Sequence, residues 1–386
     1  MKEGWEVKKL GEVCELINGR AYKRAELLEQ GKYPVLRVGN FFTNNHWYYS
    51  DLELDKNKYC DNGDLLYAWS ASFGPRIWDG NKVIYHYHIW KLLPNESKIL
   101  KAFLYKFLLY DTEKIKTEKG VGTTMVHVTK GAMEKRELYL PLIEEQKQIV
   151  SILDKTFAAI EQARANVQQN LENARELFQS ELNAIFSQKG EGWEEKRLGD
   201  LSFMKSGGTP LKSKKEYWNN GNIPWYSSGE LNHTYTQASK GFITLEGLNN
   251  SNAKLFPKGS LLIGMYDTAA LKMSILDREA TFNQAIAGFP PTGDIDNLFI
   301  LHYINSKKED LLNLRRGVRQ KNLSLKKLKD IIIELPSLET QKEVINKLDS
   351  LNNKINSLQS HYQQKLDELD ELKQSLLQQA FSGHLT

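Results

Sequence analysis

Residues 141–150 read PLIEEQKQIV, and residues 336–345 read PSLETQKEVI. The likeness continues without an insertion or deletion to Phe186 and Phe381, so each residue of the first copy is matched 195 positions later. After its opening proline neither copy contains Gly or Pro, and both are rich in Glu, Gln, Lys, Leu and Ala. This composition, opened by a proline, predicts two long helices.

The apolar residues of both copies recur at coiled-coil spacing. In the second copy they are Val344, Leu348, Leu351, Ile355, Leu358 and Tyr362, followed after a change of phase by Leu366, Leu369, Leu372 and Leu376. In the first copy they are Phe157, Ile160, Val167, Leu171, Ala174, Phe178 and Ile185. Each helix needs a partner for its apolar stripe, and the chain supplies one.

The duplication extends beyond the helices, because residues 4–13 read GWEVKKLGEV and residues 192–201 read GWEEKRLGDL. The offset here is 188, so a net 195 − 188 = 7 residues have been added in the second globular half. The chain is therefore a tandem repeat. We predict a first globular domain at 1–140, a first helix at 141–188, a second domain at 189–335 and a second helix at 336–386.

The globular halves alternate strand-like runs with turn signals, as α+β domains do. The predicted strands are 33–38, 64–69 and 82–92 in the first half, and 223–226, 260–265 and 280–289 in the second. Short helices are predicted at 99–110 and 298–312.

The composition is that of an ordinary globular protein, with 386 residues, 40% apolar and 26% charged, and a net charge of only +4. The sequence has no signal-peptide pattern and no apolar run long enough for a membrane span. Cys14 and Cys60 form no metal-binding or disulfide pattern. We therefore expect a soluble cytoplasmic protein.

No sequence motif for ATP binding, dinucleotide binding or amino-methyl transfer is found. His86 and His88 alternate along a predicted strand and so share one of its faces, but no further ligand stands at a useful spacing, which favours packing over metal binding. We expect no metal, no cofactor and no catalytic residue.

Basic and amide-rich loops stand at equivalent points of both halves, which favours a shared anionic ligand over solvated turns. Such loops bring backbone amides to phosphates and amide or guanidinium groups to base edges. The candidate DNA-binding residues of the first half are Arg20, Tyr22, Lys23, Arg24, Asn44, Asn45, Lys119, Thr123 and Thr124. Those of the second half are Lys205, Thr209, Lys212, Lys214, Lys215, Arg315, Arg316, Arg319, Gln320, Lys321 and Asn322.

The whole chain resembles the specificity subunits of type I restriction-modification systems. The resemblance rests on the two GWE openings, on Gly207-Gly208-Thr209-Pro210 followed by Ile223-Pro224-Trp225, on residues 317–324 (GVRQKNLS), and on the helix start at 140–146. The first half departs from this pattern, with Asn18-Gly19-Arg20 in place of the Gly-Gly-Thr-Pro turn and Thr124-Met125-Val126-His127 in place of Arg319-Gln320-Lys321-Asn322.

The resemblance implies two target-recognition domains that each read half of a bipartite sequence in double-stranded DNA. It also implies two spacer helices that pair as an antiparallel coiled coil, with pseudo-twofold symmetry. Members of this family lack catalytic activity alone. They recruit two methyltransferase subunits, through which restriction and translocase subunits join. The candidate docking residues lie at the helix starts: Glu144, Gln146, Lys147, Glu339, Gln341 and Lys342.

Two other classes stay open at this point. A self-contained DNA-modifying or DNA-cleaving enzyme with fused specificity domains would need catalytic motifs, which the sequence does not show. A coiled-coil scaffold would account for the helices but not for the paired basic loops.

Overall fold

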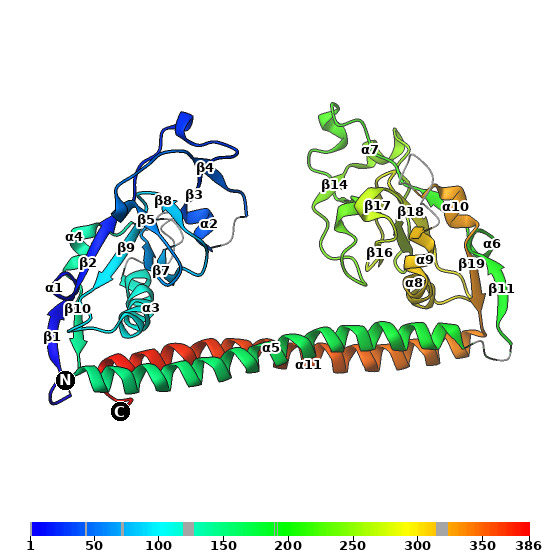
Figure 1. The fold of residues 1–386 in the computed structure, drawn as a ribbon. Coiled ribbons are helices and arrows are strands. Elements are labelled where there is room, and N and C mark those ends of the chain that lie inside the picture. The colour runs from blue at the N-terminus through cyan, green and yellow to red at the C-terminus, as the bar shows by residue number, and fades with distance from the viewer. Residues whose placement is uncertain are drawn as a thin grey trace. The chain divides into compact units, whose positions relative to one another are not determined.

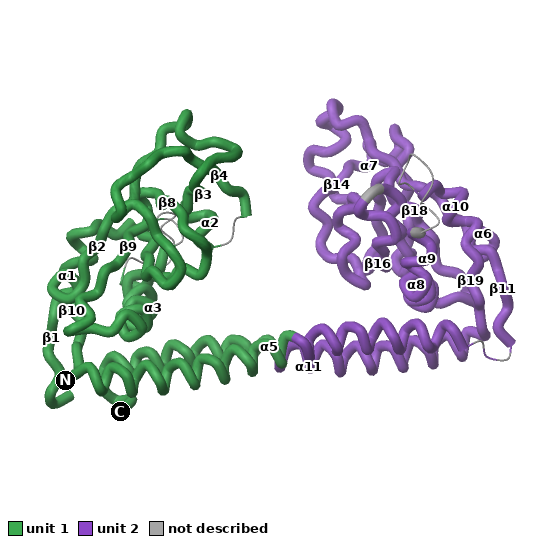
Figure 2. The backbone as a smooth tube through the Cα atoms, in the orientation of Figure 1, with its two compact units in different colours: residues 1–168, 363–386 green, residues 169–362 purple. Residues whose placement is uncertain are grey.

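The computed structural model describes residues 2–42, 45–70, 73–118, 127–188, 190, 192–313 and 323–386. The chain forms two compact units (Figure 2). Unit 1 contains residues 1–168 and 363–386, and unit 2 contains residues 169–362. Each long helix therefore begins in one unit and ends in the other.

Unit 1 is built on two four-stranded sheets and a two-stranded ribbon (Figure 1). The first sheet is antiparallel, in the order β2 (Cys14–Asn18), β9 (Ile89–Pro94), β6 (Leu65–Ala68), β7 (Gly74–Ile77). The second has the order β4 (Tyr48–Ser50), β3 (Tyr33–Leu36), β8 (Val83–Tyr85), β5 (Tyr59–Cys60), and only its β3–β8 pair is parallel. The ribbon pairs β1 (Glu6–Lys9) with β10 (Glu137–Leu140).

The main core of unit 1 lies between the first sheet and helix α3 (Lys101–Glu118). Tyr67 and Trp90 from the sheet and Phe103 and Phe107 from the helix are almost fully buried there. The remaining short helices of unit 1 are α1 (Leu10–Val13), η1 (Arg24–Glu26), α2 (Val38–Phe42), η2 (Lys56–Lys58) and α4 (Lys130–Glu134).

Unit 2 repeats this plan, with one strand fewer among the described residues of its second sheet. Its antiparallel sheet has the order β12 (Lys205–Ser206), β18 (Ile286–Phe289), β15 (Leu261–Gly264), β16 (Met273–Ile275). Its second sheet has the order β14 (Gly241–Ile243), β13 (Ile223–Tyr226), β17 (Thr281–Phe282), and its ribbon pairs β11 (Glu194–Arg197) with β19 (Ile332–Leu335). Where unit 1 has β5, unit 2 has an isolated bridge between Phe256 and Ala280.

Unit 2 also contains short helices. They are α6 (Leu198–Leu201), η3 (Lys215–Tyr217), η4 (Ser228–Glu230), α7 (Leu245–Asn249), η5 (Asp267–Ala269), α8 (Asn297–Ser306), α9 (Lys308–Asn313) and α10 (Leu325–Lys329).

Most predicted elements are confirmed, but two predicted strands are wrong in the same way. The segment 82–92 is two strands, β8 and β9, and the segment 280–289 is likewise β17 and β18. A tight turn separates the strands in each case, so His86 and His88 do not alternate along one strand. The predicted helix at 298–312 is also divided, at Lys307, into α8 and α9.

The long helices are α5 (Ile143–Ser187) and α11 (Leu338–Ser382), each of 45 residues, as the repeat predicts. Within unit 1 they run antiparallel, because Glu161 pairs with Lys373 at 2.9 Å while Arg164, one turn on, pairs with Asp370, one turn back. Within unit 2, Leu182 and Phe186 share a core with Ile345 and Leu348.

The predicted apolar stripes are confirmed in part. Phe157, Ile160, Val167 and Ala174 of α5 are buried, as are Leu348 and Ile355 of α11. Leu358 and Leu372 were predicted in the stripe but are 45% and 46% exposed. The helical spacing therefore locates the packed face but not each residue on it.

The fourth residue of each long helix is a fully buried glutamine. The side-chain amide of Gln146 donates to the carbonyls of Lys98 and Pro141, both at 2.9 Å, and its oxygen accepts from the Leu100 amide at 2.9 Å. Gln341 does the same, with Asp294, Pro336 and Asp296 as partners. The prediction that these two glutamines dock a partner is wrong, because both side chains are buried and form hydrogen bonds that hold the helix against its own unit.

The ends of the long helices are built into the cores of the units. Phe381, near the end of α11, contacts the rings of Phe103, Phe107 and Tyr110 in unit 1, with centroid separations of 5.3 to 5.6 Å. Phe186, its counterpart near the end of α5, contacts Phe299 and Tyr303 in unit 2. Each unit is thus completed by the helix that begins in the other.

No helix in the described part of the chain is long and apolar enough to cross a membrane. Among the same residues, no group of three or more His, Cys, Asp or Glu side chains is placed to hold a metal ion.

Candidate nucleic-acid interface

In unit 1, β8 passes into β9 through a tight turn at residues 86–89. The Ile89 amide donates to the His86 carbonyl at 2.9 Å, and the His86 amide donates to the Leu36 carbonyl of β3 at 2.9 Å. The amide of Trp69, directly after β6, donates to the His88 carbonyl at 3.0 Å. Because backbone groups of both sheets hold the turn, its shape does not depend on its side chains.

A glycine brings the first basic loop against this turn. The Gly19 amide donates to the Ile89 carbonyl at 3.1 Å, and the Arg20 amide donates to the Tyr85 carbonyl at 3.0 Å. A Cβ atom on Gly19 would lie 2.3 Å from the His86 carbonyl oxygen, so only glycine permits the approach. The predicted loop at 18–24 therefore begins in contact with the turn.

Unit 2 contains the same arrangement, with equivalent backbone bonds at the turn and at its glycine. The Ile286 amide donates to the Asn283 carbonyl at 3.1 Å, and the Asn283 amide donates to the Tyr226 carbonyl of β13 at 2.9 Å. Gly207 stands where unit 1 has Gly19. Its amide donates to the Ile286 carbonyl at 3.1 Å, and a Cβ on it would lie 2.1 Å from the Phe282 carbonyl oxygen.

The second basic loop of each half returns to the same place. The Val128 amide donates to the Trp69 carbonyl at 3.3 Å, and in unit 2 the Leu323 amide donates to the Met265 carbonyl at 2.8 Å. These bonds attach the chain just after each loop to the strand beside each turn. The DNA-binding residues predicted within these loops lie outside the described residues. They are Lys119, Thr123 and Thr124 in the first half, and Arg315, Arg316, Arg319, Gln320, Lys321 and Asn322 in the second. The predicted residue Asn44 also lies outside the described residues.

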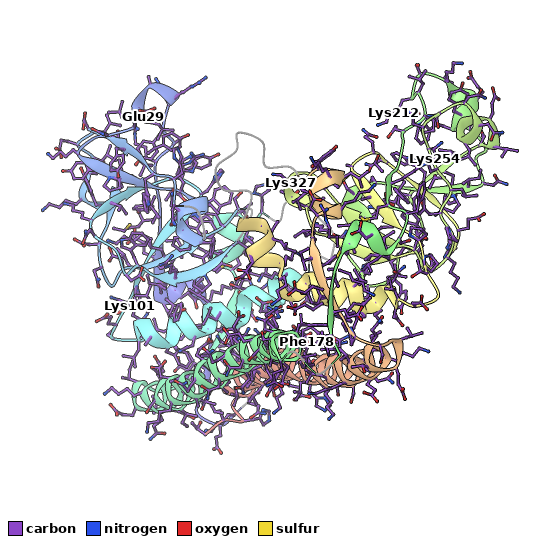
Figure 3. All side chains as sticks on the ribbon, turned by 90° about the vertical axis from the view of Figure 1, so that its right-hand side faces the viewer. Glu29, Lys101, Phe178, Lys212, Lys254 and Lys327 are labelled. Carbon is purple, nitrogen blue, oxygen red and sulfur yellow. The ribbon has the colours of Figure 1, made fainter. Side chains whose placement is uncertain are left out.

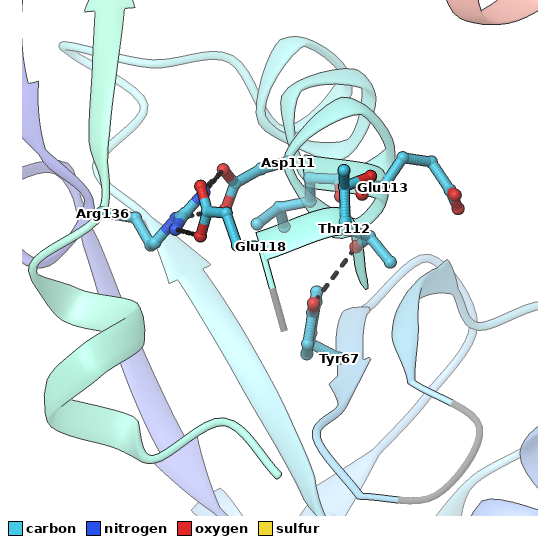
Figure 4. Close-up of polar contacts among 8 residues, drawn as sticks. Tyr67, Asp111, Thr112, Glu113, Glu118 and Arg136 are labelled. Atoms are coloured by element: carbon cyan, nitrogen blue, oxygen red, sulfur yellow. Dashed lines mark hydrogen bonds and ion pairs between the residues drawn. The ribbon is translucent and has the colours of Figure 1, made fainter. Parts of the chain in front are cut away.

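An ionic cluster secures the helix that leads into the first of these loops (Figure 4). The Arg136 guanidinium bonds both the Asp111 carboxylate, at 3.0 Å from Nε, and the Glu118 carboxylate, at 2.7 Å. This pairing lowers the pKa of Glu118, the last residue of α3. On the other side of α3, the hydroxyls of Tyr67 and Thr112 lie 3.1 Å apart. The helix end is therefore held rigidly where the loop begins.

The predicted residues of the first loop differ in their availability. Lys23 and Arg24 are exposed, as is Asn45, which lies after α2 and outside this loop. Arg20 makes two hydrogen bonds to the Glu26 carboxylate, at 2.8 and 2.9 Å, which lower the pKa of Glu26 to about 2. The Arg20 guanidinium also lies over the Tyr22 ring at 5.2 Å. Arg20 and Tyr22 thus brace the loop, while Lys23 and Arg24 face solvent.

In unit 2 the lysines on either side of Gly207 and Gly208 are all exposed: Lys205 before the glycines, and Lys212, Lys214 and Lys215 after them. Lys205 lies over the Phe203 ring at 4.3 Å, and Lys214 bonds the Tyr217 hydroxyl at 3.1 Å. Lys212 lies at the end of unit 2 away from the long helices (Figure 3). Thr209 donates its hydroxyl to the side-chain oxygen of Gln284, in the turn at 283–286. These cations can contact a phosphate backbone.

The turn of unit 1 is surrounded by aromatic and imidazole groups, which the sequence analysis did not assign to the interface. The His86 and His88 rings lie 4.8 Å apart, and Trp69 meets His88 edge to face at 4.9 Å. Burial, with smaller contributions from His88 and Arg37, lowers the pKa of His86 to about 4, and burial also lowers the pKa of His88. Both imidazoles are therefore neutral at pH 7.

These histidines line a recess of about 300 Å³ together with Arg37, His46 and Tyr48. Arg37 is exposed, and its guanidinium lies over the Tyr48 ring at 5.3 Å. A neutral imidazole offers one donor and one acceptor, and a guanidinium offers paired donors, which are the groups that recognise base edges.

Of the docking residues predicted at the helix starts, Glu144, Lys147, Glu339 and Lys342 are exposed. Lys147 pairs with Glu144 at 2.7 Å on the surface of α5. These four side chains remain candidates for a protein contact, whereas Gln146 and Gln341 do not.

Comparison with known proteins gives this architecture a family. The family model of the type I restriction modification DNA specificity domain matches the chain twice, at residues 2–172 and 190–368. The EcoR124I/EcoR124II specificity subunit of Escherichia coli is 32% identical over 224 residues, which cover 54% of this chain and 53% of that protein. The EcoBI specificity subunit of the same species is 22% identical over 420 residues, covering 100% of this chain and 87% of that protein.

The match to the EcoR124I/EcoR124II subunit thus spans about half of that relative's length, whereas the match to the EcoBI subunit spans most of it. Among solved structures, a chain from a study of the assembly and conformational transition of a type I R-M system has a TM-score of 0.76 at 19% identity, covering 100% of this chain and 99% of that one. The HsdS subunit of Thermoanaerobacter tengcongensis has a TM-score of 0.57 at 17% identity, covering 100% and 98%. At these identities the likeness concerns the fold.

The duplicated units, the helices that they share and the two family matches lead to one conclusion: this chain belongs to the family of type I restriction modification DNA specificity domains.

Proposed function

We propose that this chain is the DNA-recognition subunit of a type I restriction-modification complex and reads a bipartite, asymmetric target in double-stranded DNA. The observation that carries this proposal is the repeated frame: in each unit a glycine-led basic loop, a tight turn and the end of a second basic loop meet at one place. Two equivalent frames with different side chains are suited to reading two different half-sites.

We assign the two recognition domains to residues 1–140 and 189–335, and the spacers to residues 141–188 and 336–386. The spacers would then set the number of unread base pairs between the half-sites. We infer that this subunit is located in the cytoplasm and binds DNA there.

We assign no catalytic role to the chain. Methyl transfer and cleavage would come from two methyltransferase subunits and from the restriction and translocase subunits that join through them. The exposed Glu144, Lys147, Glu339 and Lys342 are our candidates for docking the methyltransferases. Family membership does not support the two alternatives, a self-contained enzyme and a pure scaffold.

Binding to a pool of random-sequence duplexes tests this function. We expect the full chain, alone or with its methyltransferase subunits, to enrich two short half-sites at a constant separation. We expect no cleavage or methylation by the chain alone. Enrichment of no sequence at all would refute the recognition role, and cleavage by the purified chain would favour the enzyme alternative.

The salt dependence of binding tests the second basic loop. Lys321→Ala should weaken binding to every sequence and lower the log–log salt slope by about 0.9, the loss of one phosphate contact. Lys365→Ala, at an exposed position of α11, is the matched control and should leave the slope unchanged. An unchanged slope for Lys321→Ala would remove this lysine from the interface.

A further inference from the structure

The turns at 86–89 and 283–286 have one backbone and two sets of side chains. Tyr85-His86-Tyr87-His88-Ile89 in unit 1 corresponds to Phe282-Asn283-Gln284-Ala285-Ile286 in unit 2 through matched backbone hydrogen bonds. In the part of the chain that the structure describes, the bond from the Tyr87 amide to the Arg20 carbonyl is the exception, because it is found in unit 1 alone. The exposure also matches: the end residues are buried, the second turn residue is exposed and its two neighbours are half-buried. The apolar ends keep their character, and only the three residues between them change chemistry.

A position of this kind is free to vary without harm to the fold. Backbone bonds to Leu36 and Tyr226, and the glycine contacts, hold the two turns, and in unit 2 the Asn283 side chain adds one bond within the turn. By contrast, changes at Gly19, Gly207, Ile89 or Ile286 would disturb close contacts or the core. Side-chain differences between the two turns that do not affect folding can determine which bases each unit prefers.

We propose that these matched turns are the specificity-determining elements of the two domains, with Gln284, positioned by Thr209, reading an adenine in the second half-site. The residues His86, Tyr87 and His88 read the corresponding position of the first half-site, which therefore differs. This inference rests on the proposed DNA-recognition function and names the residues that carry it.

Within the second turn, the hydrogen bonds separate the reader from the support. The Asn283 side-chain oxygen accepts from the Ala285 amide at 3.1 Å, so Asn283 stabilises the turn itself. Gln284 is exposed, and its side-chain oxygen accepts from the Thr209 hydroxyl. This bond orients the carboxamide and leaves its NH₂ group and a second oxygen lone pair for a ligand. A glutamine amide matches the N6 and N7 edge of adenine with two hydrogen bonds.

The first turn offers different chemistry on the same backbone. His86 stacks near Tyr22 with centroids 6.3 Å apart, and Trp69 packs against both Tyr87 and His88. These contacts restrict the orientations of the His86 and His88 rings. Since both imidazoles are neutral at pH 7, they act as hydrogen-bonding groups and not as phosphate-binding cations. The first turn is thus suited to bind a base edge. Its hydrogen-bonding groups differ from the carboxamide that Gln284 offers in the second turn.

Selection from a pool of random-sequence duplexes with the full chain tests this proposal. Gln284→Ala should reduce the preference for adenine at one position of the second half-site by about 5- to 150-fold. Thr209→Val should relax the same position less, because Thr209 acts only through Gln284. In both variants the first half-site and the other positions of the second half-site should stay as in the wild type, which also shows that both units are folded. Gln179→Ala, at an exposed glutamine of α5, is the matched control and should change neither half-site.

A graft provides an independent test with a gain of preference. Replacing the first turn by the second (His86→Asn, Tyr87→Gln and His88→Ala together) should change the preferred base at the corresponding position of the first half-site only. Unchanged preferences in both the graft and Gln284→Ala, with binding intact, would overturn the proposal while leaving the recognition function standing. Loss of all binding by Gln284→Ala would overturn it too, since an exposed base reader carries little of the phosphate-driven affinity. If the wild type itself selected no sequence, the proposed function would be the part that fails.

Discussion

Replacing the buried glutamine at the start of α5 should destabilise unit 1 strongly. Gln146→Leu keeps the side chain's approximate volume but removes three hydrogen bonds, and it leaves the buried Pro141 carbonyl without its donor. An unsatisfied buried polar group costs about 1–3 kcal/mol and each partly exposed bond about 1 kcal/mol, whereas burying a leucine returns about 1–2 kcal/mol. We expect a net loss of about 3 kcal/mol in the free energy of unfolding.

Calorimetry converts this loss into a measurable shift. Unit 1 has 168 + 24 = 192 residues, and for domains of this size each kcal/mol lowers the Tm by about 2–4 °C. The transition of unit 1 should therefore fall by about 6–12 °C. Gln148→Leu, two residues further along the same helix and exposed, is the control and should shift the Tm little. A melting curve of Gln146→Leu that overlays the control would refute the assigned role.

The variant Gln146→Glu adds a dependence on pH with a known sign. A protonated carboxyl group can still donate to a carbonyl and accept from Leu100, but a carboxylate would oppose two carbonyl oxygens. The folded-state pKa of the new group should therefore lie above its unfolded value near 4.3. A raised pKa contributes stability that is present at low pH and lost as the pH rises through the folded value. The deficit relative to the wild type should grow as the pH rises above about 4.3.

Three further predictions concern the spacer, the docking face and the turn. Inserting four or seven residues within Lys155–Phe178 of α5 should lengthen the unread gap between the half-sites and leave both half-sites unchanged, as read by selection from random duplexes; altered half-sites with an unaltered gap would contradict the spacer role. Reversing the charge of Lys147 and Lys342 together should reduce co-purification of the methyltransferase subunits without lowering the Tm, and undiminished co-purification would exclude these lysines from the contact. Because the pKa of His86 falls to about 4 on folding from its usual value near 6.5, the stability of unit 1 should be full above pH 6.5 and decline as the pH falls toward 4, and His86→Asn should flatten that decline in urea unfolding curves.

The duplication allows the long helices to be predicted almost residue by residue, because the two copies align over their whole length without an insertion or deletion. The turn at 86–89 escapes the same reasoning, since the segment from Lys82 to Leu92 is rich in β-branched and aromatic residues and has no Gly, Pro or Asn at positions 86–88. Its shape is imposed by Leu36 and Trp69, which are distant in sequence. Tertiary hydrogen bonds therefore override the strand propensity of residues 86–88 and produce a turn.

The errors in the candidate site have a similar origin. Gln146 and Gln341 were assigned to a docking face because polar residues at a helix start are usually exposed. Their burial depends on the carbonyls of Lys98 and Asp294, 48 and 47 positions away. The basic loops are predicted to be equivalent from the sequence, but the contact of the first loops with the turns depends on the close approach of Gly19 to His86 and of Gly207 to Phe282, which a linear pattern does not reveal.

The placement of Phe381 in the core of unit 1 has a consequence for synthesis. The ribosome must add 381 − 168 = 213 residues after the first part of unit 1 before this ring can reach Phe103 and Phe107. At about 5–20 residues per second, this interval lasts about 10–40 s. During it the nascent first half exposes the apolar surface that Phe381 later covers. The half that is translated first is therefore the half that depends longer on protection from aggregation.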